Sequence, residues 1–235
     1  MTDLVVEQFR YNFDNLGYLI FGDRDAIAVD GGAVEEILAF LKKRHLELQL
    51  VVNTHAHYDH TIGNDDLLRH SRALFLSCET LAARGRIELE GKTISVYATP
   101  GHTSDSLCFQ IDTILLTGDT LFNGTVGNCF SGNHHSFYLS IKKILTLPPE
   151  TVIYAGHDYV KTSMAFARRI EPGNRAIGAF LRRYDPKHVF STLADEKKIN
   201  PYLRFNEPDI VKLLVKLRLP RETEWERWHS LMSIE

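Results

Sequence analysis

The sequence predicts a β-rich domain of mixed strands and helices, followed by a small basic helical region. Short apolar runs bounded by Gly, Asp and Asn recur along residues 1–160 and are typical of strands. After residue 160 the apolar residues recur with a helical period instead. The charge changes at the same place, from 12 Lys and Arg against 20 Asp and Glu in residues 1–160 to 15 against 10 in residues 161–235.

The composition is that of a globular protein with its own core. The chain has 235 residues, of which 44% are hydrophobic and 24% charged, which argues against disordered, collagen-like and coiled-coil proteins. No apolar run approaches the roughly 20 residues of a membrane span, and the first residues show no secretory signal pattern. The three cysteines form no CxxC pair and are expected to be reduced thiols. We therefore expect a cytoplasmic protein without a membrane partner.

Eight short apolar runs are the expected strands, at residues 18–21, 26–29, 50–52, 73–76, 94–97, 107–111, 114–116 and 152–154. Two segments between them predict helices. Residues 33–44 place apolar side chains on one face, and residues 137–146 do the same before a Pro-Pro pair ends the helix. Three more amphipathic segments predict the C-terminal helices, at residues 162–170, 174–184 and 207–218.

The segment Thr54-His-Ala-His-Tyr-Asp-His60 is the densest group of potential metal ligands. It directly follows an apolar run, so it lies on the loop that leaves a buried strand, where sites are commonly built. Alternate residues of an extended segment point the same way, so the imidazoles of His55 and His57 can reach one ion. Asp59 and His60 follow at once and could serve a second ion. Surface or capping histidines are the alternative interpretation, but this pattern seldom arises by chance.

Three further segments each place one ligand-type residue after a predicted strand. These residues are His102, Asp119 and His157, and each follows a glycine, which allows a sharp turn or a close approach of the backbone. Alone, each segment would be an ordinary turn. Together with the first motif they supply five histidines and two aspartates. That set suits two ions, with three histidines on one, an aspartate and two histidines on the other, and one bridging carboxylate.

These motifs resemble the metallo-β-lactamase superfamily and, within it, glyoxalase II, the hydroxyacylglutathione hydrolases. The resemblance covers nearly the whole chain, and its superfamily motifs lie at residues 54–60, 100–103, 118–122 and 156–159. The strings Glu171-Pro-Gly-Asn, Ser191-Thr-Leu-Ala-Asp-Glu and Asn200-Pro-Tyr-Leu-Arg favour the glyoxalase II branch. The resemblance implies an α+β fold, with a four-layer αββα sandwich over residues 1–160 and a helical substrate-binding region over residues 161–235.

The resemblance also implies a ligand set in two groups joined by one carboxylate: His55, His57 and His102 for the first metal, Asp59, His60 and His157 for the second, and Asp119 as the bridge. Two divalent ions about 3.5 Å apart can hold a hydroxide that attacks a thioester carbonyl while one ion stabilises the oxyanion. This chemistry makes Asp59 and Asp119 the expected catalytic carboxylates. Zinc is the first candidate metal, and iron and manganese also suit these ligands.

The expected substrate contacts depart from the family pattern. After the bridging aspartate the family has a basic residue and a tyrosine that bind glutathione, and Asn128 and Phe130 stand at those positions. The loss of that charge predicts weak use of glutathione thioesters. Tyr159 matches the family's other substrate tyrosine, and Arg218-Leu-Pro-Arg221 matches its C-terminal Arg-x-x-Lys. Ordinary packing for the tyrosine, and a solvated helix surface for the arginines, are the alternative interpretations.

The predicted function is hydrolysis of acyl-thioesters such as S-lactoylglutathione to a carboxylic acid and a free thiol. The nearest rivals are another thioesterase or a lactonase of the same superfamily. A persulfide dioxygenase with a single non-haem iron belongs to a different class, but the chain lacks the Gly-Arg-Thr-Asp string associated with that branch. A non-catalytic scaffold does not need seven ligands. No basic patch interleaved with aromatic residues indicates nucleic-acid binding, so the expected partner is a small thioester, and the oligomeric state stays open.

Overall fold

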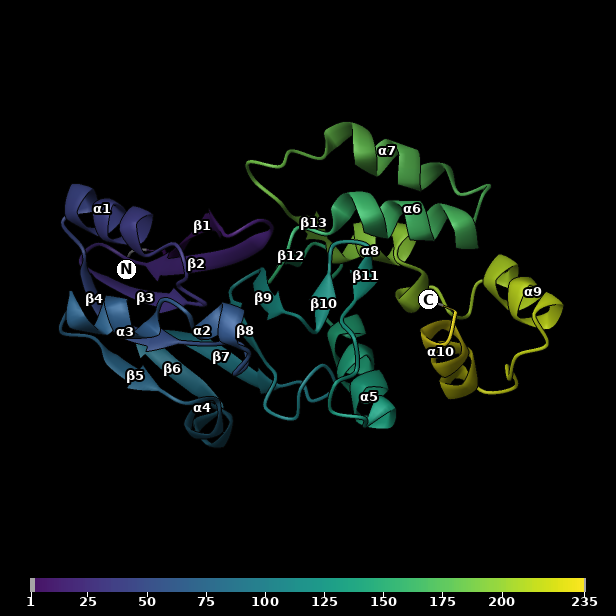
Figure 1. Ribbon diagram of the computed structural model, residues 1–235, viewed down its shortest axis with the longest axis horizontal. Coiled ribbons are helices and arrows are strands. Elements are labelled where there is room, and N and C mark those ends of the chain that lie inside the picture. The colour runs from purple at the N-terminus through teal and green to yellow at the C-terminus, as the bar shows by residue number, and fades with distance from the viewer. Residues whose placement is uncertain (1–2, 235) are drawn as a thin grey trace.

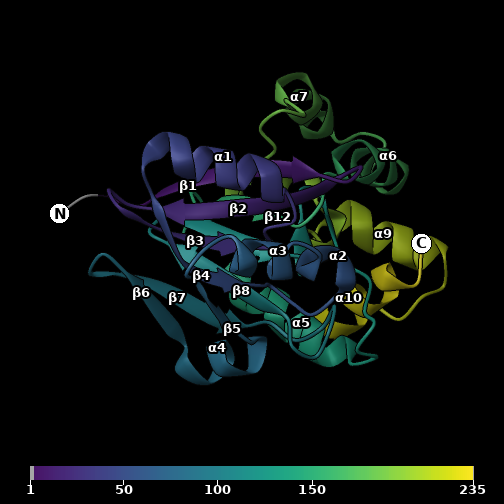
Figure 2. The ribbon, with the colours of Figure 1, turned by 60° about the vertical axis from the view of Figure 1, so that its left-hand side comes forward.

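The computed structural model describes residues 3–234 and contains two β-sheets covered by helices (Figures 1 and 2). The first sheet has the order β1 (Val5–Tyr11), β2 (Asn15–Phe21), β3 (Asp25–Val29), β4 (Glu47–Val52), β5 (Leu74–Leu76). The second has the order β13 (Ser191–Thr192), β12 (Val152–Ala155), β9 (Ile114–Gly118), β8 (Leu107–Ile111), β7 (Lys92–Ala98), β6 (Arg86–Leu89). Each sheet is therefore built from its own continuous stretch of chain.

The parallel strand pairs determine at which edge of each sheet the carboxyl ends of the strands lie. β3 runs parallel to β4, β4 to β5, and β9 to β12. Parallel neighbours need a crossover connection, which α1 (Val34–Arg44) supplies between β3 and β4, and α2 (Tyr58–Thr61) with α3 (Asn64–Arg69) between β4 and β5. The carboxyl ends of parallel neighbours therefore lie at the same edge of a sheet.

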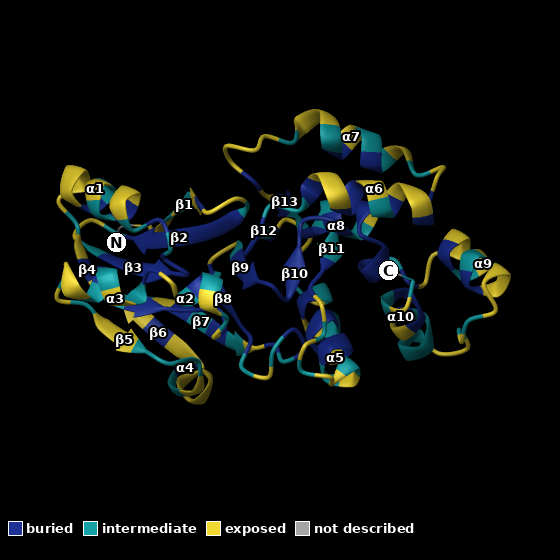
Figure 3. Cartoon of the chain, in the orientation of Figure 1, coloured by how far each residue is buried: buried dark blue, intermediate teal, exposed yellow. Residues whose placement is uncertain are grey.

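The core lies between the two sheets. One cluster of buried side chains contains Leu16 and Tyr18 of the first sheet together with Phe109 and Leu116 of the second. Figure 3 shows the central strands as almost wholly buried, whereas the outer helices are exposed on one side. Removal of this apolar surface from water is the main force that holds the sheets together.

The remaining helices cover the second sheet and its C-terminal side. They are α4 (Cys78–Arg84), α5 (His134–Leu145), α6 (Val160–Ile170), α7 (Arg175–Arg183), α8 (Leu193–Ile199), the 3-10 helix η1 (Pro201–Leu203), α9 (Pro208–Lys216) and α10 (Glu224–Met232). A two-stranded hairpin, β10 (Leu121–Phe122) with β11 (Thr125–Val126), follows β9. A second core cluster joins α5 to α10, where the rings of Phe137 and Trp228 are 5.6 Å apart.

The predicted fold class is confirmed, and each predicted strand and helix has a counterpart. The helix expected at 137–146 begins earlier, because the Asn133 side chain accepts a hydrogen bond from Ser136 N at 2.9 Å and caps it. The region 161–235 is not wholly helical, since β13 joins the second sheet beside β12. The division into regions 1–160 and 161–235 stays a prediction. Within residues 3–234, no helix is long and apolar enough to cross a membrane.

Candidate metal centre

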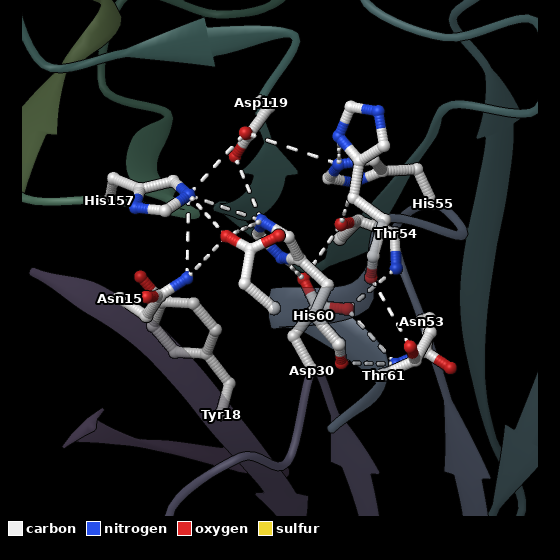
Figure 4. A network of polar contacts seen from close by, with 12 residues as sticks. Asn15, Tyr18, Asp30, Asn53, Thr54, His55, His60, Thr61, Asp119 and His157 are labelled. Carbon is white, nitrogen blue, oxygen red and sulfur yellow. Dashed lines mark hydrogen bonds and ion pairs between the residues drawn. The ribbon is translucent and has the colours of Figure 1, made fainter. Parts of the chain in front are cut away.

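Seven candidate ligands converge from four parts of the chain. The loop after β4 and the short helix α2 carry four of them, and the loops after β7, β9 and β12 carry one each. They are His55, His57, Asp59, His60, His102, Asp119 and His157. Figure 4 shows His55, His60, Asp119 and His157 turned toward one another. The candidate metal centre thus lies where strands of both sheets end.

The first group consists of His55, His57 and His102, whose ligand atoms all lie within 4.8 Å of one another. Nδ1 of His57 is 3.0 Å from Nε2 of His55 and 3.1 Å from Nε2 of His102. A neutral imidazole has only one N–H, so His57 cannot donate to both neighbours. Three ring nitrogens that meet in this way form a set of lone pairs suited to a cation.

The second group consists of Asp59, His60 and His157, again with ligand atoms within 4.8 Å of one another. Nε2 of His60 is 3.2 Å from Nε2 of His157. Oδ2 of Asp59 lies 3.3 Å from Nε2 of His157 and 3.6 Å from Nε2 of His60. This group places a carboxylate beside two imidazoles, as the sequence predicts for a second ion.

Asp119 lies between the two groups and contacts both. Its Oδ2 is 3.5 Å from Nε2 of His102 and 3.5 Å from Nε2 of His157, and its Oδ1 is 3.4 Å from Nε2 of His60. The carboxylate is buried, and Oδ1 has no hydrogen-bond partner. A buried oxygen without a partner is costly unless a group absent from the chain completes its contacts. Divalent cations fit this position.

Hydrogen bonds outside the centre determine which ring nitrogen faces inward. The pairs, each 2.9 Å apart, are His102 Nδ1 with the Asn128 carbonyl oxygen, His60 Nδ1 with Asp30 Oδ2, and His157 Nδ1 with Asp14 Oδ1. Carbonyl and carboxylate oxygens can only accept, so each Nδ1 carries the proton. Each Nε2 therefore presents its lone pair to the centre, an arrangement common among metal-bound histidines.

Charge and burial shift the pKa values of these side chains in opposite directions. Burial lowers the pKa of His60, but the carboxylates of Asp30 and Asp119 outweigh it and hold that pKa well above its ordinary value. Burial, with the nearby His60, lowers the pKa of His55 to about 4. Burial alone would raise the pKa of Asp119, but the neighbouring His157 and His60 outweigh it and hold that pKa well below the usual range. Asp119 is therefore ionised and His55 neutral, the states in which each can bind a cation, whereas a cation at His60 would have to displace a proton.

Two glycines allow the backbone to approach the centre. Gly118 has φ +48°, and a Cβ there would lie 2.4 Å from Oγ1 of Thr54. A Cβ on Gly156 would lie 2.2 Å from Oδ1 of Asp119. A Cβ at either position would clash with these atoms. This confirms the expectation that the two glycines permit a close approach of the backbone.

Three residues that support the centre were missed by the sequence analysis. Asp30 accepts hydrogen bonds from Thr54 N at 2.8 Å and Thr54 Oγ1 at 2.7 Å, in addition to its contact with His60. Asn15 donates to Oδ2 of Asp59 at 2.8 Å, and Asp14 holds His157. A signal existed for Asp30, because it follows a predicted strand and precedes a Gly-Gly pair. Asp14 lies just before β2 and Asn15 is its first residue, and neither carries such a signal.

The predicted substrate residues are not all brought together. Asn128 and Tyr159 line one cavity of about 320 Å³, together with Phe122, Thr125, Val126, Thr162, Ser163, Phe166 and Arg169. The Tyr159 ring stacks on His157, with centroids 4.9 Å apart. The cavity therefore opens beside the candidate metal centre.

The other predicted substrate residues lie outside this cavity. Phe130 is 67% exposed, and its ring lies 5.6 Å from that of His57 and 5.3 Å from that of His102. Arg218 and Arg221 belong to the turn between α9 and α10, where Arg221 Nη1 donates to the Leu219 carbonyl oxygen at 3.1 Å. A substrate role for these three residues stays a prediction.

Known proteins match this chain along almost its whole length. The model of the metallo-beta-lactamase superfamily matches residues 13–86 and 83–157, and that of the hydroxyacylglutathione hydrolase C-terminus matches residues 158–229. A hydroxyacylglutathione hydrolase of Pseudoalteromonas translucida (strain TAC 125) is 33% identical over 225 residues, which cover 89% of this chain and 88% of the relative.

Solved structures share the fold. The crystal structure of ETHE1 from Myxococcus xanthus has a TM-score of 0.67 at 24% identity and covers 92% of both chains. That of TTHA1623 in a di-iron-bound form has a TM-score of 0.58 at 21% identity and covers 85% of this chain and 100% of the other. Fold, site geometry and sequence identity agree. The chain therefore belongs to the metallo-β-lactamase superfamily and, within it, is an enzyme of the glyoxalase II family, the hydroxyacylglutathione hydrolases.

Proposed function

We propose that this chain uses two divalent metal ions to hydrolyse acyl-thioesters, such as S-lactoylglutathione, to a carboxylic acid and a free thiol. The observation that supports this most directly is the presence of two complete ligand groups that share Asp119. In this proposal the first group holds one ion and the second group holds the other. The name of the Pseudoalteromonas translucida relative, a hydroxyacylglutathione hydrolase, supports the substrate class.

Divalent ions at these positions would supply an activated water at neutral pH and would polarise the carbonyl oxygen of the substrate. The chain's own residues prepare the site for this chemistry. Asp30 and Asp14 hold the Nδ1 protons of His60 and His157, so that Nε2 of each ring stays free. Tyr159 covers one face of His157 and so limits access of water from that side.

A covalent mechanism has no support from Cys78 or Cys108. Burial raises the pKa of Cys78 to about 12 and that of Cys108 to about 11, so both stay protonated thiols at neutral pH. A protonated thiol is a poor nucleophile. Neither cysteine is among the candidate ligands.

The ligand types leave the choice of metal to experiment. Imidazole and carboxylate suit zinc, iron and manganese, and cellular supply then decides among them. The alternative of another class is a persulfide dioxygenase of this superfamily, which needs one iron. The complete second group, Asp59, His60 and His157, favours two ions and hence hydrolysis.

Two measurements on the same purified sample test the proposal. Metal analysis is expected to show close to two equivalents per chain. A hydrolysis panel of S-lactoylglutathione, other acyl-thioesters, homoserine lactones and a β-lactam is expected to show thioesters as the best substrates. One equivalent in a fully active sample would contradict the dinuclear mechanism. Oxygen uptake with glutathione persulfide, without thioester hydrolysis, would establish the dioxygenase instead.

A further inference from the structure

The cavity beside the metal centre contains one charged side chain, and that charge has no acidic partner. Among the lining residues, all of which the structure describes, only Arg169 is charged. It forms no ion pair with a carboxylate in residues 3–234. Its guanidinium instead lies 5.0 Å from the ring of Phe166, which also lines the cavity. Phe166 in turn stacks on Tyr202, with centroids 5.8 Å apart, so the guanidinium rests on a fixed aromatic surface.

Ser163 supplies a second, independent sign that a ligand binds here. It lies one and a half turns before Arg169 on α6 and is 4% exposed, yet its hydroxyl has no hydrogen-bond partner. A serine in a helix commonly bonds back to the carbonyl four residues earlier, but this one does not. A buried hydroxyl without a partner destabilises the protein unless a ligand completes the bond.

The position of the cavity indicates which part of a substrate it receives. Tyr159 belongs to both the cavity and the surroundings of the metal centre, and Phe122 contacts His157 and Tyr159 at centroid distances of 5.9 and 5.0 Å. A thioester with its carbonyl at the metal centre can therefore extend one of its halves along this cavity. A volume of about 320 Å³ suits a short peptide-like group and is small for a nucleotide-bearing thiol such as coenzyme A.

The family resemblance already implies that the thiol half of the substrate lies along this cavity, because Asn128 and Tyr159 line it. We propose that Arg169 pairs with a carboxylate at its far end and that Ser163 hydrogen-bonds a polar group along it. This inference rests on the proposed thioesterase function and assigns the specificity of the same site. Arg169 thereby supplies the positive charge that position 128 lacks, because Asn128 is neutral and lines the same cavity. The chain therefore selects small anionic thiols despite its departure from the family pattern.

Arg168 offers a matched control for Arg169. It is the neighbouring arginine on α6, does not line the cavity, and points toward α7, where its Nη2 would lie 3.8 Å from a Cβ on Gly178. Arg168→Gln and Arg169→Gln remove the same charge from the same helix. A difference between the two variants therefore reports the position of the charge and not the net charge of the region.

The test uses the metal-loaded protein and two substrates, S-lactoylglutathione and its analogue with a glycine carboxamide in place of the glycine carboxylate. For the wild type, KM is expected to be about 10-fold lower for the carboxylate substrate, because charged hydrogen bonds contribute more than neutral ones. Arg169→Gln should raise that KM about 10-fold and remove the preference, with kcat changed less than about twofold. Arg168→Gln should keep the preference.

Ser163→Ala separates a ligand contact from a structural role. The variant should raise KM for both substrates by about 2–10-fold, because one neutral hydrogen bond is lost. Its thermal stability should stay the same or rise, because a buried hydroxyl without a partner is removed. A lower melting temperature with unchanged KM would overturn the role given to Ser163.

The outcomes also distinguish this inference from the proposed function. If the wild type hydrolyses neither these two substrates nor any other thioester of the panel, the thioesterase proposal fails, and calorimetric binding of S-methylglutathione then decides the inference. Weaker binding to Arg169→Gln than to Arg168→Gln supports the cavity assignment. Equal effects of the two variants on KM or binding, or no binding to the wild type, overturn it. Equal or faster hydrolysis of a lactoyl-coenzyme A thioester overturns the selectivity for small thiols.

Discussion

Asp119 is the residue through which the two ligand groups are connected. Its oxygens lie within 3.5 Å of ring nitrogens from both groups, whereas Tyr159 contacts the site only by stacking on His157. With two ions bound as proposed, loss of the carboxylate would remove a ligand from both at once and leave their charge uncompensated. Loss of the tyrosine hydroxyl removes at most one hydrogen bond to substrate, worth about 0.5–1.5 kcal/mol.

We therefore predict that Asp119→Ala lowers kcat by more than about 100-fold. This loss is at least as large as that caused by removal of one oxyanion-stabilising contact. Tyr159→Phe should lower kcat/KM only about 2–12-fold, since each 1.4 kcal/mol is tenfold. Steady-state kinetics with one thioester and metal analysis of each variant provide the comparison. Equal losses in kcat for the two variants would contradict the role given to Asp119.

Asp30 acts through His60 and Thr54 and does not touch the site itself. It is 1% exposed and accepts three hydrogen bonds from these two residues. We predict that Asp30→Asn weakens metal binding at the second group about 10–100-fold, as expected when the outer partner of a metal-bound histidine is changed. Competition with a chelator measures this affinity. The control is Asp65→Asn, an exposed aspartate on α3, and a similar loss in the control would rule out the role of Asp30.

At the scale of elements, α8 carries a buried acid that affects stability. Glu196 accepts hydrogen bonds at Oε2 from Gly124 N at 3.0 Å and Asn200 Nδ2 at 2.8 Å, but its buried Oε1 has no partner. Burial raises the pKa of Glu196 to about 7. Its folded form therefore binds a proton more tightly than its unfolded form, and the resulting stabilisation is present below pH 4.5 and lost as the pH rises through 7.

We predict that Glu196→Gln gains stability relative to the wild type as the pH rises. Between pH 5 and 8 the difference in unfolding free energy should shift by about 2–3 kcal/mol in favour of the variant, from a pKa difference of about 2.5 units. Urea denaturation of both proteins at each pH measures it, and comparison at the same pH cancels the titration of the histidines. A pH-independent difference would show that Glu196 titrates normally.

Most elements could be predicted from the sequence because their patterns are strong. The expected strand at 26–29 is a continuous apolar run, that at 107–111 is interrupted only by Gln110, and the structure buries all the remaining residues of both. β6 was missed because it is only four residues long and two of these are charged and exposed. α10 was missed because its buried Trp228 and Leu231 pack against α5, a distant contact that no local pattern records.

Some residues of the candidate site could likewise be predicted from the sequence, and others could not. The histidines and aspartates of the ligand set could be found because they cluster in short motifs that follow predicted strands. Ser163 and Arg169 could not, because a serine and an arginine on an amphipathic helix are ordinary. The two residues are singled out because the Ser163 hydroxyl lacks a hydrogen-bond partner and because both line the same cavity. Both features depend on where the chain places distant segments.

For the whole molecule, the metal centre joins the two sheets. Four candidate ligands follow β4 in the first sheet, and His102, Asp119 and His157 follow strands of the second. Ions bound there would hold the sheets together only in the folded state, and a ligand that binds the folded state alone stabilises it by mass action.

We predict that removal of metal by a chelator lowers the melting temperature by about 10 °C. At a metal concentration 1,000 times Kd the stabilisation is about 4 kcal/mol, and each kcal/mol shifts Tm by about 2–4 °C in a chain of this size. Thermal unfolding with and without chelator, followed by return of zinc, iron or manganese, measures the effect. An unchanged melting temperature in a metal-depleted sample would mean that the centre does not link the sheets.

The placement of each sheet in one continuous stretch of chain bears on how the protein is made. A ribosome releases residues 5–76, and with them every strand of the first sheet, before residues 86–192 of the second have emerged. The inner face of the first sheet, with Ile20 and Ile27, then has no partner until Phe109 and Leu116 arrive. The newly made first sheet thus has a bare apolar face, and that face is prone to aggregation for as long as translation takes to complete the second sheet.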